Sequence, residues 1–178
     1  MDNIGEILLK IYDPISPKHF DKNEWWIISL FFLIGFIVFY LHKKSRIVST
    51  SELLLIFFLN IYLASLGDYI LAMDPIDLYD TVDLDSGELF DIPLHMVVYP
   101  GTIYIAMHFY FLIRPKKSYY IVFWALLLTF LEWISTHFFH LYTYKGWHLR
   151  YSFLVYLFTM TVNLLLLKGV RKSFSKCK

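Results

Sequence analysis

Long apolar runs separated by short polar segments form the dominant pattern of this chain. The runs do not alternate between apolar and polar residues as half-buried strands do. Each is near the roughly 20 residues that a helix needs to cross about 30 Å of hydrocarbon. The pattern therefore predicts an all-α fold, a polytopic membrane bundle of five transmembrane helices. The expected spans are about 25–41, 52–73, 91–113, 118–140 and 151–167.

The composition agrees with a single integral membrane domain over residues 1–178. The chain is 58% hydrophobic and 20% aromatic, with only 17% charged residues, and its net charge is +1. No basic stripe lies on a foldable soluble face, so no nucleic-acid partner is expected. The single cysteine, Cys177, excludes an internal disulfide and a cysteine-based metal site.

The basic residues predict how the spans are oriented. Lys and Arg concentrate after spans one, three and five, and such segments stay on the cytoplasmic side. The expected arrangement is N-out and C-in, with a basic cytoplasmic tail at 168–178 and an acidic outer loop after span two. Residues 1–24 lack the basic start and the cleavage site of a secretory signal, so they are expected to form an outer interfacial segment. The predicted location is the cell membrane, with lipids as partners.

Three ionisable residues lie inside the predicted spans at a similar depth. At about 1.5 Å per helical residue, Asp68 and His95 lie roughly 24 Å from the inner surface and Glu132 roughly 21 Å. A carboxylate inside a span costs about 2.5–3.5 kcal/mol on insertion scales, judged from the comparable acid Asp, so such groups are functional candidates by default. Glu132 is therefore the strongest single lead in the chain.

Helical spacing places these residues on polar faces of their spans. Tyr99 follows His95 on one face, and Thr136 follows Glu132 on another. Spans two to five are expected to surround a polar intramembrane pocket that opens outward, with span one at the periphery. The predicted lining is Asp68, His95, Tyr99, Glu132, Thr136 and Asn163.

Span three contains a helix-breaking pair near the membrane midplane. Pro100 removes one backbone hydrogen bond and Gly101 follows it directly, so a kink is expected there. Broken helices at this depth line cavities or serve packing, and the sequence does not distinguish the two.

Three interpretations of the polar residues stay open at the level of the sequence. In the first, they hold helices together through interhelical hydrogen bonds, worth about 0.6 kcal/mol each on average. In the second, they form a metal-free pocket that binds or senses a small molecule, lipid or cation and links binding to pH. In the third, Asp91, His95, His137 and His140 hold a divalent metal such as zinc. Glu132 would then be the catalytic general base of a membrane enzyme acting on a lipid or isoprenoid.

The metal-free pocket is the leading prediction, and it implies neither a cofactor nor catalysis. A different alternative is an accessory subunit of a larger membrane complex. Ser65 and Gly67 give span two a small-residue face suited to close helix approach. A homo-oligomer or a larger membrane partner is therefore an open alternative.

Three short motifs resemble those of a known family. They are Phe90-Asp-Ile-Pro-Leu-His-Met-Val-Val-Tyr-Pro100, Leu131-Glu-Trp133 and Tyr144-Lys-Gly-Trp147. In these motifs the chain from span two to span five is similar to a family of small, uncharacterised integral membrane proteins of spore-forming Firmicutes. The resemblance implies a multi-span protein of a bacterial plasma membrane, and it transfers no activity to this chain.

Overall fold

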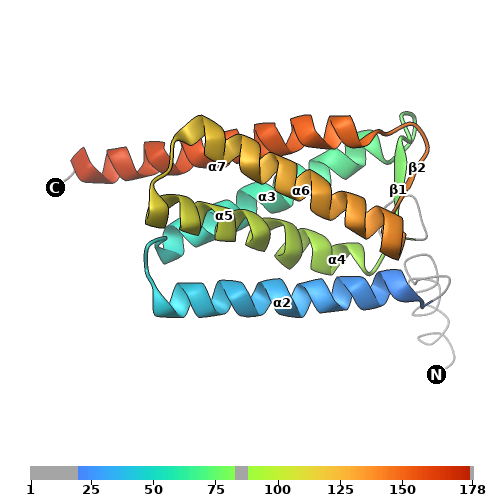
Figure 1. The fold of residues 1–178 in the computed structure, drawn as a ribbon, viewed down its shortest axis with the longest axis horizontal. Helices are drawn as coiled ribbons and strands as arrows, with labels where there is room; N and C mark the ends of the chain where they lie inside the picture. Colours follow the sequence, from blue (N-terminus) through green and yellow to red (C-terminus); the bar gives the residue numbers. More distant parts are fainter. Residues whose placement is uncertain (1–19, 83–87, 177–178) are drawn as a thin grey trace, which may run out of the picture.

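The computed structural model describes residues 20–82 and 88–176, and it confirms the predicted all-α membrane bundle (Figure 1). Within these described residues, five helical segments are long and apolar enough to cross a membrane. They are α2 (Lys22–Lys44), α3 (Thr50–Leu71), the continuous unit of α4 (Asp91–Pro93), η1 (Leu94–Val98) and α5 (Tyr99–Ile113), then α6 (Lys117–Phe139) and α7 (Leu149–Lys176). The predicted interfacial segment at 1–24 falls mostly outside the described residues.

Capping explains why the first two helices begin a few residues before the predicted spans. Asp21 caps α2 and Ser49 caps α3, and each forms a capping box with the glutamate three residues later. The backbone N–H of Ser49 donates to Glu52 Oε2 at 2.8 Å, and the N–H of Glu52 donates to Ser49 Oγ at 3.3 Å. Such reciprocal bonds satisfy N–H groups that lack partners within the helix. The polar residues at these positions therefore start the helices rather than precede them.

The last helix is longer than predicted, because the expected basic tail continues it. The sequence analysis ended span five at residue 167, but α7 runs to Lys176. Lysine and arginine are good helix formers, so a change from apolar to basic residues does not end a helix. Two side chains also hold the extension in place: Lys168 donates to the Tyr110 hydroxyl at 2.6 Å, and Arg171 pairs with Glu52 at 2.5 Å.

The unit α4–η1–α5 lies at the centre of the bundle. Of the residues in its most apolar 18-residue stretch, 56% are buried, against 11–22% of those in the other four spans. Helices α2 and α3 both pack against it, while α6 and α7 pair with each other and α2 lies at one edge (Figure 1). Large apolar side chains such as Phe32, Phe58, Phe123 and Phe158 are exposed on the outer helices. An apolar surface of this kind fits contact with lipid.

The central helix contains a π turn just before Pro100, the residue at which the sequence predicted a kink. In this turn, η1, the backbone N–H of Tyr99 donates to the carbonyl of Leu94, five residues earlier. Proline has no N–H, so the α-helical bond to the carbonyl four residues earlier is missing at this position in any case. Single π turns insert one extra residue into a helix and occur often at functional sites. Here the turn carries His95.

A small antiparallel sheet, absent from the sequence prediction, covers one end of the bundle. Strand β1 (Tyr79–Thr81) comes from the loop after α3, and β2 (Tyr142–Tyr144) comes from the loop after α6. The two segments lie side by side at the end where α3 and α6 finish (Figure 1). We call this end the strand end. The opposite end, with the connections 45–49 and 114–116, is the loop end.

Part of the acidic loop after α3 is held by contacts with the loop after α6. Lys145, which follows β2, lies 2.8 Å from carboxylate oxygens of both Asp77 and Asp80. The carbonyl of Leu78 accepts the backbone N–H groups of residues 145–147 at 2.9–3.0 Å. These bonds join two loops that are distant in the sequence, so this part of the loop is bound to the protein instead of being free in solvent.

Candidate functional site

The two strands present one polar face to the helices. The register pairs Tyr79 with Tyr144 and Thr81 with Tyr142, and side chains two residues apart in a strand point to the same side. Three tyrosines therefore share the face that covers the strand end. Each of them donates to, or shares a hydrogen bond with, a polar residue of the helices: Tyr79 with Asp68, Tyr144 with Glu132 and Tyr142 with Tyr99.

Glu132 of α6 forms the first cluster. Its Oε1 accepts hydrogen bonds from the Tyr144 hydroxyl at 2.5 Å and from Ser152 Oγ at 2.6 Å, and its Oε2 accepts one from the Tyr156 hydroxyl at 2.7 Å. The indole N–H of Trp147 in turn donates to Ser152 at 2.8 Å. This carboxylate is well supplied with donors from β2 and α7, and it joins both elements to α6.

Asp68 of α3 forms the second cluster. Its Oδ1 accepts a hydrogen bond from the Tyr79 hydroxyl at 2.6 Å, and its Oδ2 lies 2.8 Å from His95 Nε2 in the π turn. The side chains of Asp68 and His95 are 16% and 14% exposed. The predicted meeting of Asp68 and His95 is therefore confirmed, and the pair lies partly open to the outside of the protein.

A tyrosine pair lies between the two clusters. The hydroxyls of Tyr99 and Tyr142 are hydrogen bonded to each other. The centre of the Tyr142 ring lies 6.1 Å from the centre of the Tyr79 ring and 6.5 Å from that of the Tyr144 ring. Asp68 and Glu132 thus belong to one polar layer at the strand end. The two carboxylates have separate donor sets within it.

Burial and the nearby carboxylates favour the neutral form of the strand tyrosines. Burial, followed by the charge of Asp68, raises the pKa of Tyr79. Burial, followed by the charge of Glu132, raises the pKa of Tyr144. A phenolate beside a carboxylate would place two negative charges in a poorly hydrated site. These tyrosines therefore act as hydrogen-bond donors over the physiological pH range.

A cavity of about 350 Å³ lies beside the Asp68–His95 pair, between α3 and the start of the central helix. Its polar lining adds Ser65, Glu88 and Asp91 to that pair. The apolar lining consists of Ile61, Tyr69, Met73, Ile92 and Met96. The volume falls within the range of small-molecule pockets, and the mixed lining is typical of them.

This cavity contains only part of the predicted pocket. Asp68 and His95 line it, whereas Glu132, Tyr99, Thr136 and Asn163 do not. Glu132 and Tyr99 are bound within the layer just described, and Thr136 lies near the Tyr144 hydroxyl. Asn163 forms a buried pair with Asn60 elsewhere in the bundle. Helical spacing did not determine which polar face meets which.

The predicted metal ligands do not come together. Within residues 20–82 and 88–176, no group of three or more His, Cys, Asp or Glu side chains is arranged to hold a metal ion. His137 is exposed and stacks on the ring of Trp133 at 5.4 Å. His140 is exposed and takes a left-handed conformation that ends α6, so it does not continue the helical face of Glu132 and Thr136. The proposed ligand set of Asp91, His95, His137 and His140 is therefore wrong.

Gly67, one of the two small residues singled out on α3, has no close neighbour in the described part of the chain. A β-carbon added at Gly67 would have no atom within 4 Å. The close helix approach expected at Gly67 does not occur within residues 20–82 and 88–176.

Several residues of the polar layer were not predicted from the sequence as site residues. Tyr79, Tyr144 and Trp147 come from loops, where the sequence suggested only solvent or membrane-interface positions. Ser152 and Tyr156 share the polar face of span five with Asn163, so their spacing was the available signal. The Tyr-x-Tyr pattern of β2 was a second signal, because it is the period of a strand.

Comparison with known proteins gives no guide to this site. No family model, curated protein or solved structure matches the chain. The function must therefore be argued from the geometry of the site itself.

Proposed function

We propose that this protein is a membrane protein that binds or senses a small organic cation in the cavity beside Asp68 and His95. The observation that carries the proposal is the Asp68–His95 pair at 2.8 Å on the wall of a 350 Å³ cavity. Glu132, the strongest lead from the sequence, then has a structural role, because it is bound by three hydroxyl groups of its own chain.

The charge of the lining favours a cationic ligand. Among the described residues that line the cavity, Asp68, Glu88 and Asp91 carry carboxyl groups and His95 carries the one basic side chain, and Asp68 is the carboxylate that the charge argument uses. Ionised carboxylates form short, strong hydrogen bonds with ammonium groups. A ligand with a positively charged amine would therefore complement this wall.

The rest of the lining favours a ligand with an apolar body. Tyr69, Met73 and Met96 are all exposed side chains at the cavity. An aromatic face attracts cations, and methionine adapts to apolar groups of different shapes. A hydrated metal ion has no apolar body for the two methionines to contact, so an amine carrying a hydrocarbon or aromatic group is the better fit.

His95 would link this binding to pH. It faces Asp68 on α3 and the Tyr99 ring at 5.4 Å, while Asp91 and Glu88 line the same cavity. A protonated His95 and a bound ammonium group would compete for the Asp68 carboxylate. Affinity should therefore rise with pH as His95 loses its proton, and His95→Gln should remove most of this dependence.

The proposal also includes a location and an orientation. The basic loops predict that the strand end faces the outside of the membrane, and the proposed location is a bacterial plasma membrane. An impermeant thiol reagent applied to intact cells should then fail to label Cys177. Labelling of Cys177 in intact cells would contradict the orientation but would leave the ligand proposal unaffected.

A matched pair of ligands tests the binding proposal. The full chain in neutral detergent would be heated with phenethylammonium or with its uncharged analogue, phenethyl alcohol, above the titration range of histidine. The amine should raise the melting temperature and the alcohol should not. Asp68→Asn should weaken the effect roughly tenfold or more, because it removes a charge-assisted bond.

Asp77→Asn is the control variant, since Asp77 is also at the strand end but pairs with Lys145. It should leave the response to the amine unchanged. Equal shifts with amine and alcohol, or a full response in Asp68→Asn, would refute the proposed cation site.

A further inference from the structure

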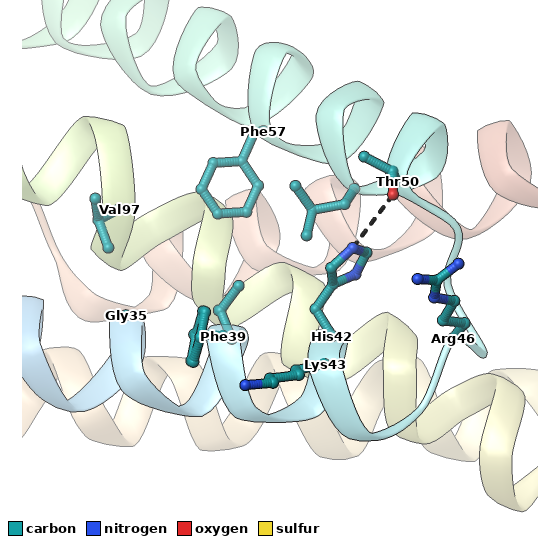
Figure 2. A pocket seen from close by; sticks show the side chains of 10 residues that line it. Gly35, Phe39, His42, Lys43, Arg46, Thr50, Phe57 and Val97 are labelled. Atoms are coloured by element: carbon teal, nitrogen blue, oxygen red, sulfur yellow. Dashed lines mark hydrogen bonds between the residues drawn. The ribbon is translucent and has the colours of Figure 1, made fainter.

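A second cavity lies at the loop end, at the opposite end of the bundle from the polar layer. Its volume is about 590 Å³. It lies between α2 and α3, and Val97 of η1 forms part of its wall (Figure 2). Phe39 of α2, Phe57 of α3 and Val97 of η1 form an apolar part. His42, Lys43, Arg46 and Thr50 form a polar part near the connection between the two helices (Figure 2).

Among the described lining residues, those of the polar part are basic or hydroxyl-bearing, and none carries a carboxylate. Lys43 and Arg46 are exposed, and neither pairs with an acidic side chain in the part of the chain that the structure describes. Lys43 instead extends over the Phe39 ring, with its Nζ 5.7 Å from the ring centre. The nearest acidic residue along α3, Glu52, is paired with Arg171 and does not line the groove. The groove therefore has unneutralised positive charge.

Hydrogen bonds fix the polar part of the groove. His42 Nε2 lies 3.3 Å from Thr50 Oγ1, which joins the end of α2 to the start of α3 (Figure 2). The other ring nitrogen, Nδ1, lies 3.3 Å from the hydroxyl of the buried Tyr104. His42 is thus held between two elements, and the basic side chains extend from a defined frame.

The apolar part continues from this basic end along the membrane-spanning surfaces. Phe39 is 64% exposed, so its ring is available to a molecule outside the protein. Both walls belong to helices with the length and composition of membrane spans. A ligand that fills the groove must therefore carry negative charge at one end and hydrocarbon at the other.

We propose that the groove between α2 and α3 is a binding site for an anionic glycerophospholipid of the surrounding leaflet. Its phosphate lies between Lys43, Arg46 and the His42–Thr50 pair, and one acyl chain lies against Phe39 and Phe57. Basic pockets between transmembrane helices are known to bind anionic head groups, and each nearby Lys or Arg adds appreciable attraction. This site is independent of the cation site at the strand end.

Lipid titration of the purified full-length protein tests the proposal. Phosphatidylglycerol, phosphatidylcholine and inorganic phosphate would be added in neutral detergent at matched ionic strength, and the melting temperature would be measured. Phosphatidylglycerol should stabilise the protein at far lower concentrations than the other two. Equal effects of the two lipids would overturn the proposal, and an equal effect of inorganic phosphate would show an anion site without a lipid.

Charge-matched variants separate the groove from general attraction to a basic surface. The double substitution Lys43→Gln with Arg46→Gln should weaken the phosphatidylglycerol response roughly 30-fold, as expected for two basic contacts. The control, Lys44→Gln with Arg114→Gln, removes the same charge at the loop end from residues outside the groove lining. It should retain most of the response, and an equal loss in the control would overturn the proposal.

Two further measurements separate a loss of lipid binding from a loss of folding. Arg46→Lys keeps the positive charge and should keep the phosphatidylglycerol response. In the absence of lipid, each variant should melt near the wild-type temperature. A loss of the response in Arg46→Lys as large as in the double variant would contradict a site based on charge.

Discussion

Asn60 on α3 and Asn163 on α7 hold each other through two reciprocal hydrogen bonds of 2.8 and 3.0 Å. Both side chains are almost completely buried, at 3% and 0% exposure. Each amide also donates to a backbone carbonyl of its own helix, so the donors of both amides are in use. Leucine at Asn163 should therefore destabilise the protein by leaving the amide of Asn60 without its partner.

A double-mutant cycle measures this pair. Asn60→Leu and Asn163→Leu, alone and together, should show a coupling energy of about 0.6 kcal/mol, and at most about 1.7 kcal/mol, in unfolding of the detergent-solubilised protein. The double variant should be more stable than the sum of the two single losses implies. Strict additivity would mean that the pair contributes no interhelical energy.

Glu132 should behave as a structural acceptor. Glu132→Leu removes the partner of three hydroxyl groups and should cost about 1–3 kcal/mol in unfolding free energy. Glu132→Gln keeps one acceptor oxygen, and hydroxyl groups can rotate, so its cost should be smaller. Tyr156→Phe, which removes one donor and leaves the carboxylate, should also cost less than Glu132→Leu. A Glu132→Leu variant as stable as wild type would contradict the structural role of Glu132.

Gly101 should be sensitive to a single added methyl group. A β-carbon there would lie 2.6 Å from Ile34 Cγ2 and 3.2 Å from Val38 Cγ2, both on α2. Because these branched side chains have few rotamers, Gly101→Ala should push α2 away from α5 and cost about 1–3 kcal/mol. Gly67→Ala is the matched control, with no atom within 4 Å of the new β-carbon, and should be neutral or stabilising. Equal melting temperatures of the two variants would contradict this packing.

The strand tyrosines should make the protein sensitive to alkali. Burial first, and the adjacent carboxylate second, raise the pKa of Tyr79 and Tyr144 above the usual value of about 10. Because the pKa is higher in the folded than in the unfolded protein, the stabilisation is complete below about pH 10 and is lost as the pH rises further. Absorbance titration should show phenols that ionise later in the folded than in the denatured protein. Tyr144→Phe should remove one of them, and a single transition identical to that of the denatured chain would refute the assignment.

The sequence predicted one of the contacts of the candidate site and missed the others. Asp68 and His95 were expected at one depth, and they meet at 2.8 Å. Glu132 was expected beside them, but Tyr144, Ser152 and Tyr156 bind it in a separate cluster. Depth follows from counting residues along a helix, whereas the neighbours of a side chain depend on how each helix is rotated within the bundle.

The sequence by itself determined that the chain forms five membrane-spanning helices, because span length and hydrophobicity are local properties that the bilayer thickness constrains. Tertiary structure decided what the polar groups do. Strands β1 and β2 pair although they come from two distant loops. Tyr79 is hydrogen bonded to Asp68, and Tyr144 is hydrogen bonded to Glu132. Among the described residues, His137 and His140 share no metal site with other ligands. The basic extension of α7 is joined to α3 through Arg171 and Glu52. These contacts join residues far apart in the sequence, and no local pattern contains the geometry with which helices and loops meet.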